Sequence, residues 1–169
     1  TSFDSAYQSI EVIGQVTGTE EKAEEVIAGM KEDLAVIEEK AASISEEEMK
    51  NVWVEVSPAP ELYTSGKGTF LDEMITMIGA KNAAGDQEGW PKFTEEDAVL
   101  LNPEVIITTY GYYVEKPVEQ VLSRDAWKDI PAVQDKQVFD IHSDKVTRPG
   151  PRLVEGLEEL AKAVYPDVY

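Results

Sequence analysis

Residues 104–109 read EVIITT, and this short apolar run is the part of the sequence that decides the fold. An apolar run without alternating polar positions is typical of a strand buried on both faces within a parallel sheet. The runs NVWVEVS at 51–57 and KQVFDI at 136–141 are two further expected strands. Because helix-forming segments separate the three, the sequence predicts an α/β fold: a mostly parallel sheet with helices on both faces.

Helices are expected wherever apolar residues recur three to four positions apart. The expected helices are 3–14, 19–42, 69–78, 94–101, 117–123 and 151–165. Capping-box spacings mark two of the starts, at Thr69 and Thr94. Gly79 ends the helix that Thr69 begins, and Pro151 suits the first turn of the last helix.

The first 45 residues do not follow the strand–helix alternation. We interpret residues 1–45 as a helical arm and residues 46–169 as one α/β lobe, since a chain of this length suffices for one domain with a real core. No signal peptide is visible, and no apolar run approaches the roughly 20 residues that span a bilayer. The chain opens without an initiating methionine, so we expect a fragment of a longer protein.

Composition argues against several classes of function. The chain has 15 Lys and Arg against 34 Asp and Glu, a formal charge of −19, which argues against the phosphate contacts of a nucleic-acid binder. It has no Cys, so no disulfide, thiol nucleophile or Cys-bound zinc is possible. The single histidine, His142, cannot build a metal site alone and is interpreted as a structural or exposed residue. No cofactor and no metal are expected.

The stretch YTSGKGTFLDEM at 63–74 invites comparison with a phosphate-binding loop. A P-loop requires G-x-x-x-x-G-K-[ST], but Glu61 stands where the first glycine should be, and Gly68 separates the lysine from Thr69. The pattern G-x-G-x-x-G fails at Leu71, and the chain contains no G-x-S-x-G. The segment is therefore interpreted as a strand–helix connection. A nucleotide-binding or hydrolase-type α/β enzyme domain stays only as the alternative function.

Five aromatic residues fall in predicted strand–helix connections instead of on a periodic apolar face. They are Tyr63, Trp90, Tyr110, Tyr112 and Tyr113. Connections that follow parallel strands gather at the carboxyl edge of the sheet, where open α/β folds bind their ligands. Aromatic rings gathered there would form a flat apolar wall for a large ligand. The alternative is that these rings only cover the sheet edge.

Arg148 lies in VTRPGPR at 146–152, where two prolines stiffen the backbone. A guanidinium held by a rigid loop can present its planar fork to a carboxylate, an amide or a phosphate. A salt bridge between Arg148 and a surface carboxylate explains the residue equally well. Arg152 is expected to pair with Glu155, three residues further on.

Three ordered stretches carry a family resemblance. They are ELYTSGKGTFLDEMITMIGAKNAA at 61–84, GWPKFTEEDAVLLNPEVIITT at 89–109 and VTRPGPRLVEGLEELAKAVYP at 146–166. Together they resemble the substrate-binding proteins of ABC importers for cobalamin, iron–siderophore complexes and haem. The stretch at 14–42, GQVTGTEEKAEEVIAGMKEDLAVIEEKAA, resembles the helix that joins the two lobes of such proteins. The resemblance covers essentially the whole chain but only the second half of the family's pattern, so the first lobe is expected to be absent here.

The resemblance implies two α/β lobes bridged by one long helix, with the ligand held in the shallow cleft between them. It implies an extracytoplasmic solute-binding component and not an enzyme, either periplasmic or lipid-anchored at the outer face of the cell membrane. Such a protein captures cobalamin or a ferric siderophore and delivers it to an ABC permease, and we expect it to be a monomer. A third alternative, an interaction domain of flavodoxin-like fold, predicts an acidic cluster after the first strand, where EVSPAP at 55–60 offers only Glu55.

The resemblance also assigns roles to individual residues. The ligand contacts that it implies are Tyr63, Trp90 and Arg148. Glu96 matches the glutamate that docks in an Arg pocket of the permease, although the helix dipole alone would explain an acid at a helix start. The stretch that holds Tyr110, Tyr112 and Tyr113 is richer in tyrosine than the cobalamin-binding pattern. These side chains would equally suit stacking on a siderophore or an approach to a haem iron.

Overall fold

Four parallel strands form the central sheet of the computed structural model, which describes residues 2–169. In spatial order the strands are β3 (Lys81–Asn82), β1 (Asn51–Glu55), β5 (Val105–Thr108) and β6 (Val138–Asp140). β1 and β5 pair with Trp53 opposite Ile106 and Glu55 opposite Thr108. Because all four strands run in the same direction, their carboxyl ends meet at one edge of the sheet, called here the carboxyl edge.

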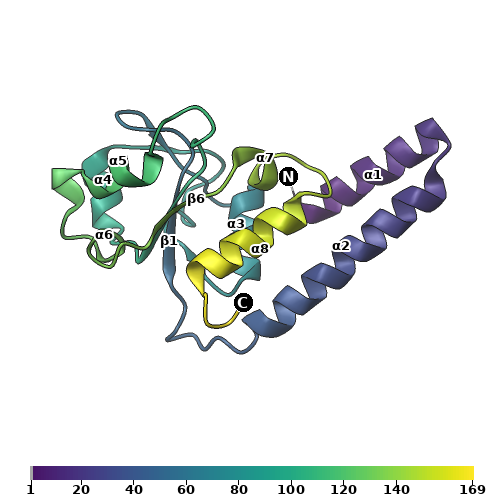
Figure 1. Cartoon of the computed structure of the whole chain (residues 1–169), viewed down its shortest axis with the longest axis horizontal. Helices are drawn as coiled ribbons and strands as arrows, with labels where there is room; N and C mark the ends of the chain where they lie inside the picture. Colours follow the sequence, from purple (N-terminus) through teal and green to yellow (C-terminus); the bar gives the residue numbers. More distant parts are fainter. Residues whose placement is uncertain (1) are drawn as a thin grey trace.

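Helices cover both faces of this sheet, as the sequence predicts (Figure 1). Successive side chains of a strand point to opposite faces, so Val52 and Val54 of β1 pack into one core while Trp53 packs into another. The helices that contribute to the first core include α2 (Glu20–Ala41), α3 (Phe70–Met77) and α8 (Leu153–Val164). The helices that contribute to the second core are α4 (Glu95–Leu100), α5 (Pro117–Leu122), η1 (Asp125–Trp127) and α6 (Pro131–Gln134).

A second, antiparallel pair of strands consists of β2 (Leu62–Tyr63) and β4 (Lys92–Phe93). These strands, β3, α6, η1 and α7 (Ser143–Val146) were not expected from the sequence. Each of them spans only two to four residues, which is too short to produce a recognisable period.

The helix ends at Thr69, Thr94 and Gly79 follow the expected capping chemistry. The hydroxyls of Thr69 and Thr94 accept hydrogen bonds from the backbone amides of Asp72 and Asp97, at 3.2 and 3.1 Å. Gly79 follows α3 with a φ of 78°, the left-handed backbone conformation that glycine adopts without strain.

The last helix differs from its expected start, because α8 begins at Leu153 and not at Pro151. The amides of Leu153 and Val154 donate three residues back, to the carbonyls of Gly150 and Pro151. Three-residue spacing closes a turn instead of an α-helical ring, so Pro151 and Arg152 precede the helix.

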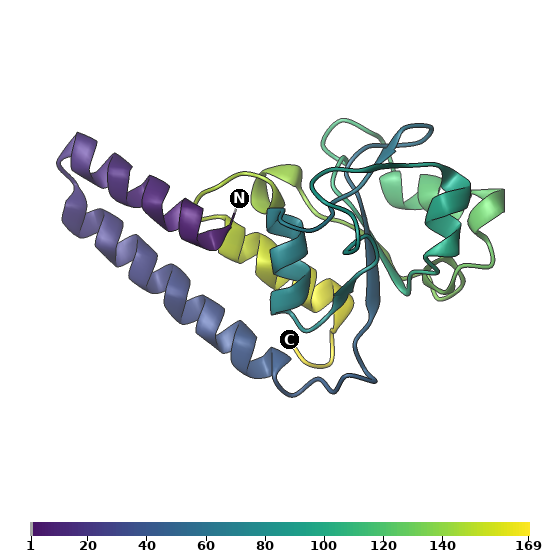
Figure 2. The ribbon, with the colours of Figure 1, turned by 180° about the vertical axis from the view of Figure 1, so that it is seen from behind.

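The arm consists of α1 (Phe3–Thr17) and α2, which form an antiparallel hairpin that projects beyond the α/β lobe (Figure 2). Gly14 lets the two helices cross closely, since a Cβ there would lie 2.7 Å from that of Ala23. The inner face of α2 shares the first core with the lobe, so the arm is anchored to the lobe. Within residues 2–169, neither α2 nor another helix combines the length and apolar character that a membrane crossing requires.

Candidate ligand-binding site

Two backbone segments beyond the carboxyl end of β1 hold Tyr63 and Trp90. Tyr63 lies in β2, Trp90 precedes β4, and the amide of Gly66 donates to the carbonyl of Gly89 at 2.8 Å. Only glycine fits at position 66, because a Cβ would lie 2.3 Å from the carbonyl oxygen of Gln87. The close approach makes the two segments a single platform, from which both aromatic side chains are exposed.

The Gly-Lys-Gly run at 66–68 is unsuited to hold a phosphate. Its three amides donate within the chain at 2.7 to 3.1 Å, to the carbonyls of Gly89 and Gln87 and to the carboxylate of Asp72. A phosphate cradle needs backbone N–H groups that are free to bind the ligand. The nucleotide-binding alternative therefore loses the feature that suggested it.

Lys92 brings a positive charge to the platform. Its Nζ lies 5.9 Å from the ring centroid of Tyr63 and 2.6 Å from the carboxylate of Glu61. The hydrogen bond to Glu61 raises the pKa of Lys92 and lowers the pKa of Glu61. Because both side chains are exposed, their pairing is weak, and Lys92 can exchange Glu61 for an acidic group of a ligand.

A short turn after β5, called here the tyrosine turn (residues 110–114), presents two more aromatic side chains. The amides of Tyr113 and Val114 both donate to the carbonyl of Tyr110, at 3.1 and 3.0 Å. The rings of Tyr112 and Tyr113 meet edge to face with centroids 4.7 Å apart, and Tyr112 lies 5.5 Å from the ring of His142. The four exposed rings, Tyr63, Trp90, Tyr112 and Tyr113, have exposed fractions of 38, 44, 60 and 55%. They lie in connections that follow the parallel strands β1, β3 and β5, at the carboxyl edge, and are called here the aromatic face.

Tyr110 is not part of this face, which corrects its expected role as a ligand contact. Its side chain is 1% exposed, and its hydroxyl donates to the carboxylate of Glu55. Burial, with the charge of Glu55 as the next cause, raises the pKa of Tyr110, so the hydroxyl remains a neutral donor. Tyr110 supports the turn from below instead of touching a ligand.

Glu55 and Arg124 form a buried ion pair that sequence reasoning left without a role. Nη1 and Nη2 of Arg124 donate to the two carboxylate oxygens of Glu55 at 2.8 and 2.7 Å. Burial lowers the pKa of Arg124, but the hydrogen bonds to Glu55 and the nearby negative charges, of which that of Glu55 is the largest, together outweigh burial and raise the pKa. One signal was available in the sequence: Glu55 is an acid within an expected strand of a sheet that was expected to have helices on both faces.

Arg148 is a surface residue, and its side chain is 74% exposed. Its Nε lies 2.7 Å from the carboxylate of Asp144, four residues earlier. Arg152 approaches the same carboxylate at 3.7 Å, which corrects its expected pairing with Glu155. Glu155 lies instead near Lys145, at 3.7 Å. Two guanidinium groups therefore gather at Asp144, beyond the carboxyl end of β6.

Glu96 lies in the first turn of α4 and is exposed. The helix start is fixed by Thr94, whose hydroxyl accepts the amide of Asp97 and donates to its carboxylate. Glu95 and Asp97 share this turn, where the helix dipole favours negative charge. The carboxylate of Glu96 is therefore presented on a defined helix end.

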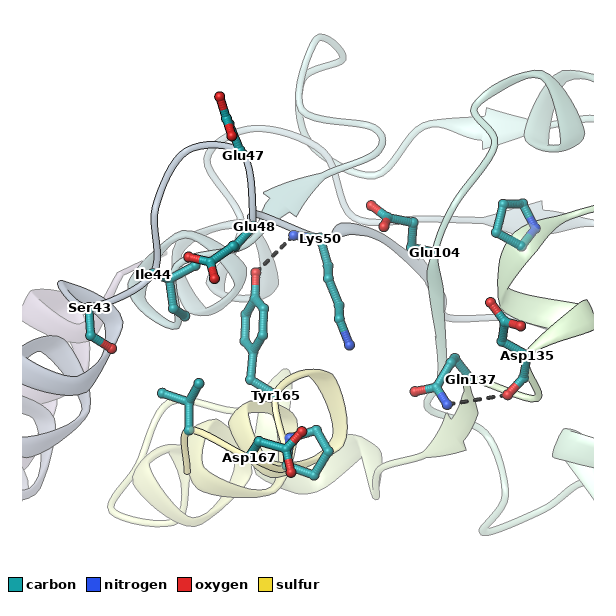
Figure 3. Close-up of a pocket in the computed structure, with 13 residues that line it drawn as sticks. Ser43, Ile44, Glu47, Glu48, Lys50, Glu104, Asp135, Gln137, Tyr165 and Asp167 are labelled. Carbon is teal, nitrogen blue, oxygen red and sulfur yellow. Dashed lines mark hydrogen bonds between the residues drawn. The ribbon is translucent and has the colours of Figure 1, made fainter.

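A cavity of about 680 Å³ lies at the other end of the sheet, where Lys50, Glu104 and Gln137 precede β1, β5 and β6. Figure 3 shows the residues that line it. Its acidic lining residues are Glu47, Glu48, Glu104, Asp135 and Asp167. The Tyr165 hydroxyl in this cavity already makes two hydrogen bonds within the protein: it accepts one from the amide of Lys50 and donates one to the carbonyl of Gly79. None of the residues expected to bind ligand lines this cavity. Within residues 2–169, no three His, Asp or Glu side chains are arranged to hold a metal ion.

Known proteins match the chain along its whole length. A family model described as "Periplasmic binding protein" matches residues 1–145. The uncharacterized ABC transporter substrate-binding lipoprotein YvrC of Bacillus subtilis (strain 168) is 51% identical over 99% of this chain and 52% of its own. The molybdate-binding protein MolA of Haemophilus influenzae is 28% identical over 98% of this chain and 48% of its own.

A solved structure shows the same fold. It is a possible iron-binding (periplasmic solute-binding) protein of Staphylococcus epidermidis, with a TM-score of 0.82 and 32% identity over 97% of this chain and 63% of that chain. The present chain spans about half the length of the relatives YvrC and MolA.

Proposed function

The chain belongs to the periplasmic binding protein family, and on this premise we propose that it is the second lobe of an extracytoplasmic solute-binding component of an ABC importer. The component captures cobalamin or a ferric siderophore and delivers it to a membrane permease. Proteins of this family bind and transfer their ligand without changing it chemically. The observation that carries the proposal is the aromatic face, whose four rings are exposed on short, hydrogen-bonded connections at the carboxyl edge.

Exposed aromatic area favours a large ligand. Apolar surface in water is unfavourable at about 25 cal/mol per Å², so a ligand that covers several rings gains binding free energy from their burial. A cobalamin or siderophore complex has an organic surface broad enough for this contact. A small oxyanion, the alternative suggested by the name of MolA, instead needs several converging N–H donors, and the amides of residues 66–68 are already bonded.

Charged side chains beside the aromatic face suit the polar rim of such a ligand. Arg148 and Lys92 are exposed, and each is held by one acid, Asp144 and Glu61. Exposed ion pairs of this kind cost little to separate. We therefore propose that either cation can turn to a carboxylate, amide or phosphate of the ligand, with Arg148 offering its planar fork.

Glu96 is proposed to dock the protein on its permease. An exposed carboxylate at a fixed helix end suits a charge-assisted contact with an arginine pocket. This contact would form outside the cytoplasm, with the protein either free in the periplasm or lipid-anchored at the outer face of the cell membrane. The name of YvrC, a lipoprotein, supports the second location.

The arm is proposed to bridge this lobe to a first lobe. Near the tip of the hairpin, α1 leaves Val12, Ile13 and Val16 exposed on neighbouring turns. The spacing of these residues places them on one side of the helix. Their exposure supports residues 1–45 as the connecting arm, with α2 as the interlobe helix and the apolar side of α1 against the first lobe.

Ligand titration of the longer protein, including its first lobe, tests this function. Cyanocobalamin, ferrioxamine B, molybdate and ATP are added in turn while Trp fluorescence is followed. We expect quenching by one of the two chelates, and we expect Trp90→Phe to reduce its amplitude. Binding of ATP alone, or of molybdate alone, would overturn the proposed ligand class.

A further inference from the structure

Glu55 is an unusual residue in the sheet because it is a carboxylate with no exposed surface. It ends β1 at the carboxyl edge, directly beneath the tyrosine turn. Three donors satisfy it: two N–H groups of Arg124 at 2.8 and 2.7 Å, and the hydroxyl of Tyr110. Arg124 also lies over an aromatic ring, with its guanidinium carbon 4.5 Å from the ring centroid of Trp127.

Stability alone does not explain a pair of this kind. Removing two charges from water is costly, and apolar replacements of similar volume often leave a protein equally or more stable. The contribution of Glu55 and Arg124 is therefore to be sought in the geometry that they impose. The group that they hold in place is the hydroxyl of Tyr110. Within the described residues, Glu55 is the only hydrogen-bond acceptor of this hydroxyl.

Tyr110 in turn carries the exposed tyrosines. Its carbonyl accepts the amides of Tyr113 and Val114, and these two bonds close the tyrosine turn. Its ring lies 6.3 Å from the ring of Tyr113. A continuous chain of contacts thus runs from the buried ion pair through Tyr110 to the aromatic face.

We propose that Glu55 and Arg124 are positioning residues that fix Tyr110 and thereby hold Tyr112 and Tyr113 in place before a ligand arrives. A preformed face binds more tightly because fewer side chains must be ordered on binding. The benefit to affinity rests on the proposed function. The rigidity of the turn is a property of the free chain and is measured without a ligand.

Amide hydrogen exchange in the free chain tests the proposal. The first variant is Tyr110→Phe, which keeps the ring and both charges but removes the hydroxyl. The second is the double variant Glu55→Met with Arg124→Leu, which replaces the ion pair by apolar groups. In both we expect exchange of the amides of Tyr113 and Val114 to accelerate about tenfold, while that of Ile107 in β5 is unchanged.

Tyr165→Phe is the matched control, because it removes a buried tyrosine hydroxyl at the opposite edge, where it donates to Gly79. It should leave exchange of the amides of Tyr113 and Val114 unchanged. A purely structural pair predicts instead that the turn and β5 accelerate together. That result would overturn the proposal, and so would unchanged exchange of the amides of Tyr113 and Val114 in Tyr110→Phe. If the double variant does not fold, Tyr110→Phe decides the question alone. Faster turn exchange in a protein that binds neither chelate would leave the positioning role standing and remove the proposed function.

Discussion

The amide of Gly111 donates to the carboxylate of Asp140 at 3.0 Å, and the approach is so close that a Cβ at position 111 would lie 2.2 Å from the second oxygen. The same carboxylate accepts the hydroxyl of Thr108 at 2.7 Å. Asp140 at the end of β6 therefore joins the tyrosine turn to the strand beside it. The turn is held from two sides, by Asp140 at Gly111 and by Glu55 at Tyr110.

Gly111→Ala should destabilise the protein by about 1–3 kcal/mol, because the new methyl group must displace a carboxylate held by two hydrogen bonds. Urea unfolding followed by circular dichroism measures the change. Gly29→Ala is the control, since Gly29 lies within α2 and a methyl group added there would meet no atom within 4 Å beyond its chain neighbours and the backbone of its own helix. This second change should stabilise by about 0.5–1 kcal/mol. Equal stabilities of Gly111→Ala and the unchanged protein would contradict the tight contact.

Tyr63→Ala should weaken binding of the chelate that quenches Trp fluorescence by about tenfold, because the substitution removes an exposed ring from the aromatic face. Isothermal titration of the longer protein gives the affinity. Leu100→Ala is the control, since it removes an exposed apolar side chain on α4 instead. Equal losses in the two variants would show that general surface hydrophobicity, and not the aromatic face, governs affinity.

The parts of the fold that were predictable are those with a local cause. The unbroken apolar run of β5 is buried as expected, and Thr69 and Gly79 bound α3 through contacts within one helical turn. The sequence could not distinguish Tyr110 from its exposed neighbours, because its partner Glu55 is 55 positions away. For Arg152, an interaction with Glu155 across a helical turn was expected, but α8 begins only at Leu153.

Glu96→Ala should reduce uptake of the bound chelate by cells that contain the whole importer, while affinity in solution stays unchanged. The physical reason is that an exposed carboxylate on α4 makes charge-assisted contacts only with a partner. Uptake of labelled chelate and isothermal titration are measured on the same variant. Glu119→Ala, an exposed acid on α5, should leave both quantities unchanged. A loss of affinity in Glu96→Ala would instead assign Glu96 to the ligand site.

Tyr169 packs against the first core, and its titration should make the free energy of unfolding depend on pH in the alkaline range. Its hydroxyl donates to the carbonyl of Ile78 at 3.0 Å, and burial raises the pKa of Tyr169 to about 12 from the ordinary value of 10.0. Between these values the unfolded chain has lost the proton that the folded chain keeps. Since the folded state then binds more protons, the free energy of unfolding should fall as pH rises from 10 towards 12.

Tyr169→Phe should lessen this fall, because the variant has no proton to lose at position 169. Urea unfolding at pH 8, 10 and 11 measures the effect, and the difference between variant and unchanged protein isolates Tyr169 from the other buried tyrosines. At pH 8 the variant should be the less stable protein, having lost the hydrogen bond to Ile78. The gap between the two proteins should then narrow steadily above pH 10. A constant gap across the three pH values would show that the Tyr169 hydroxyl titrates alike in the folded and unfolded chains.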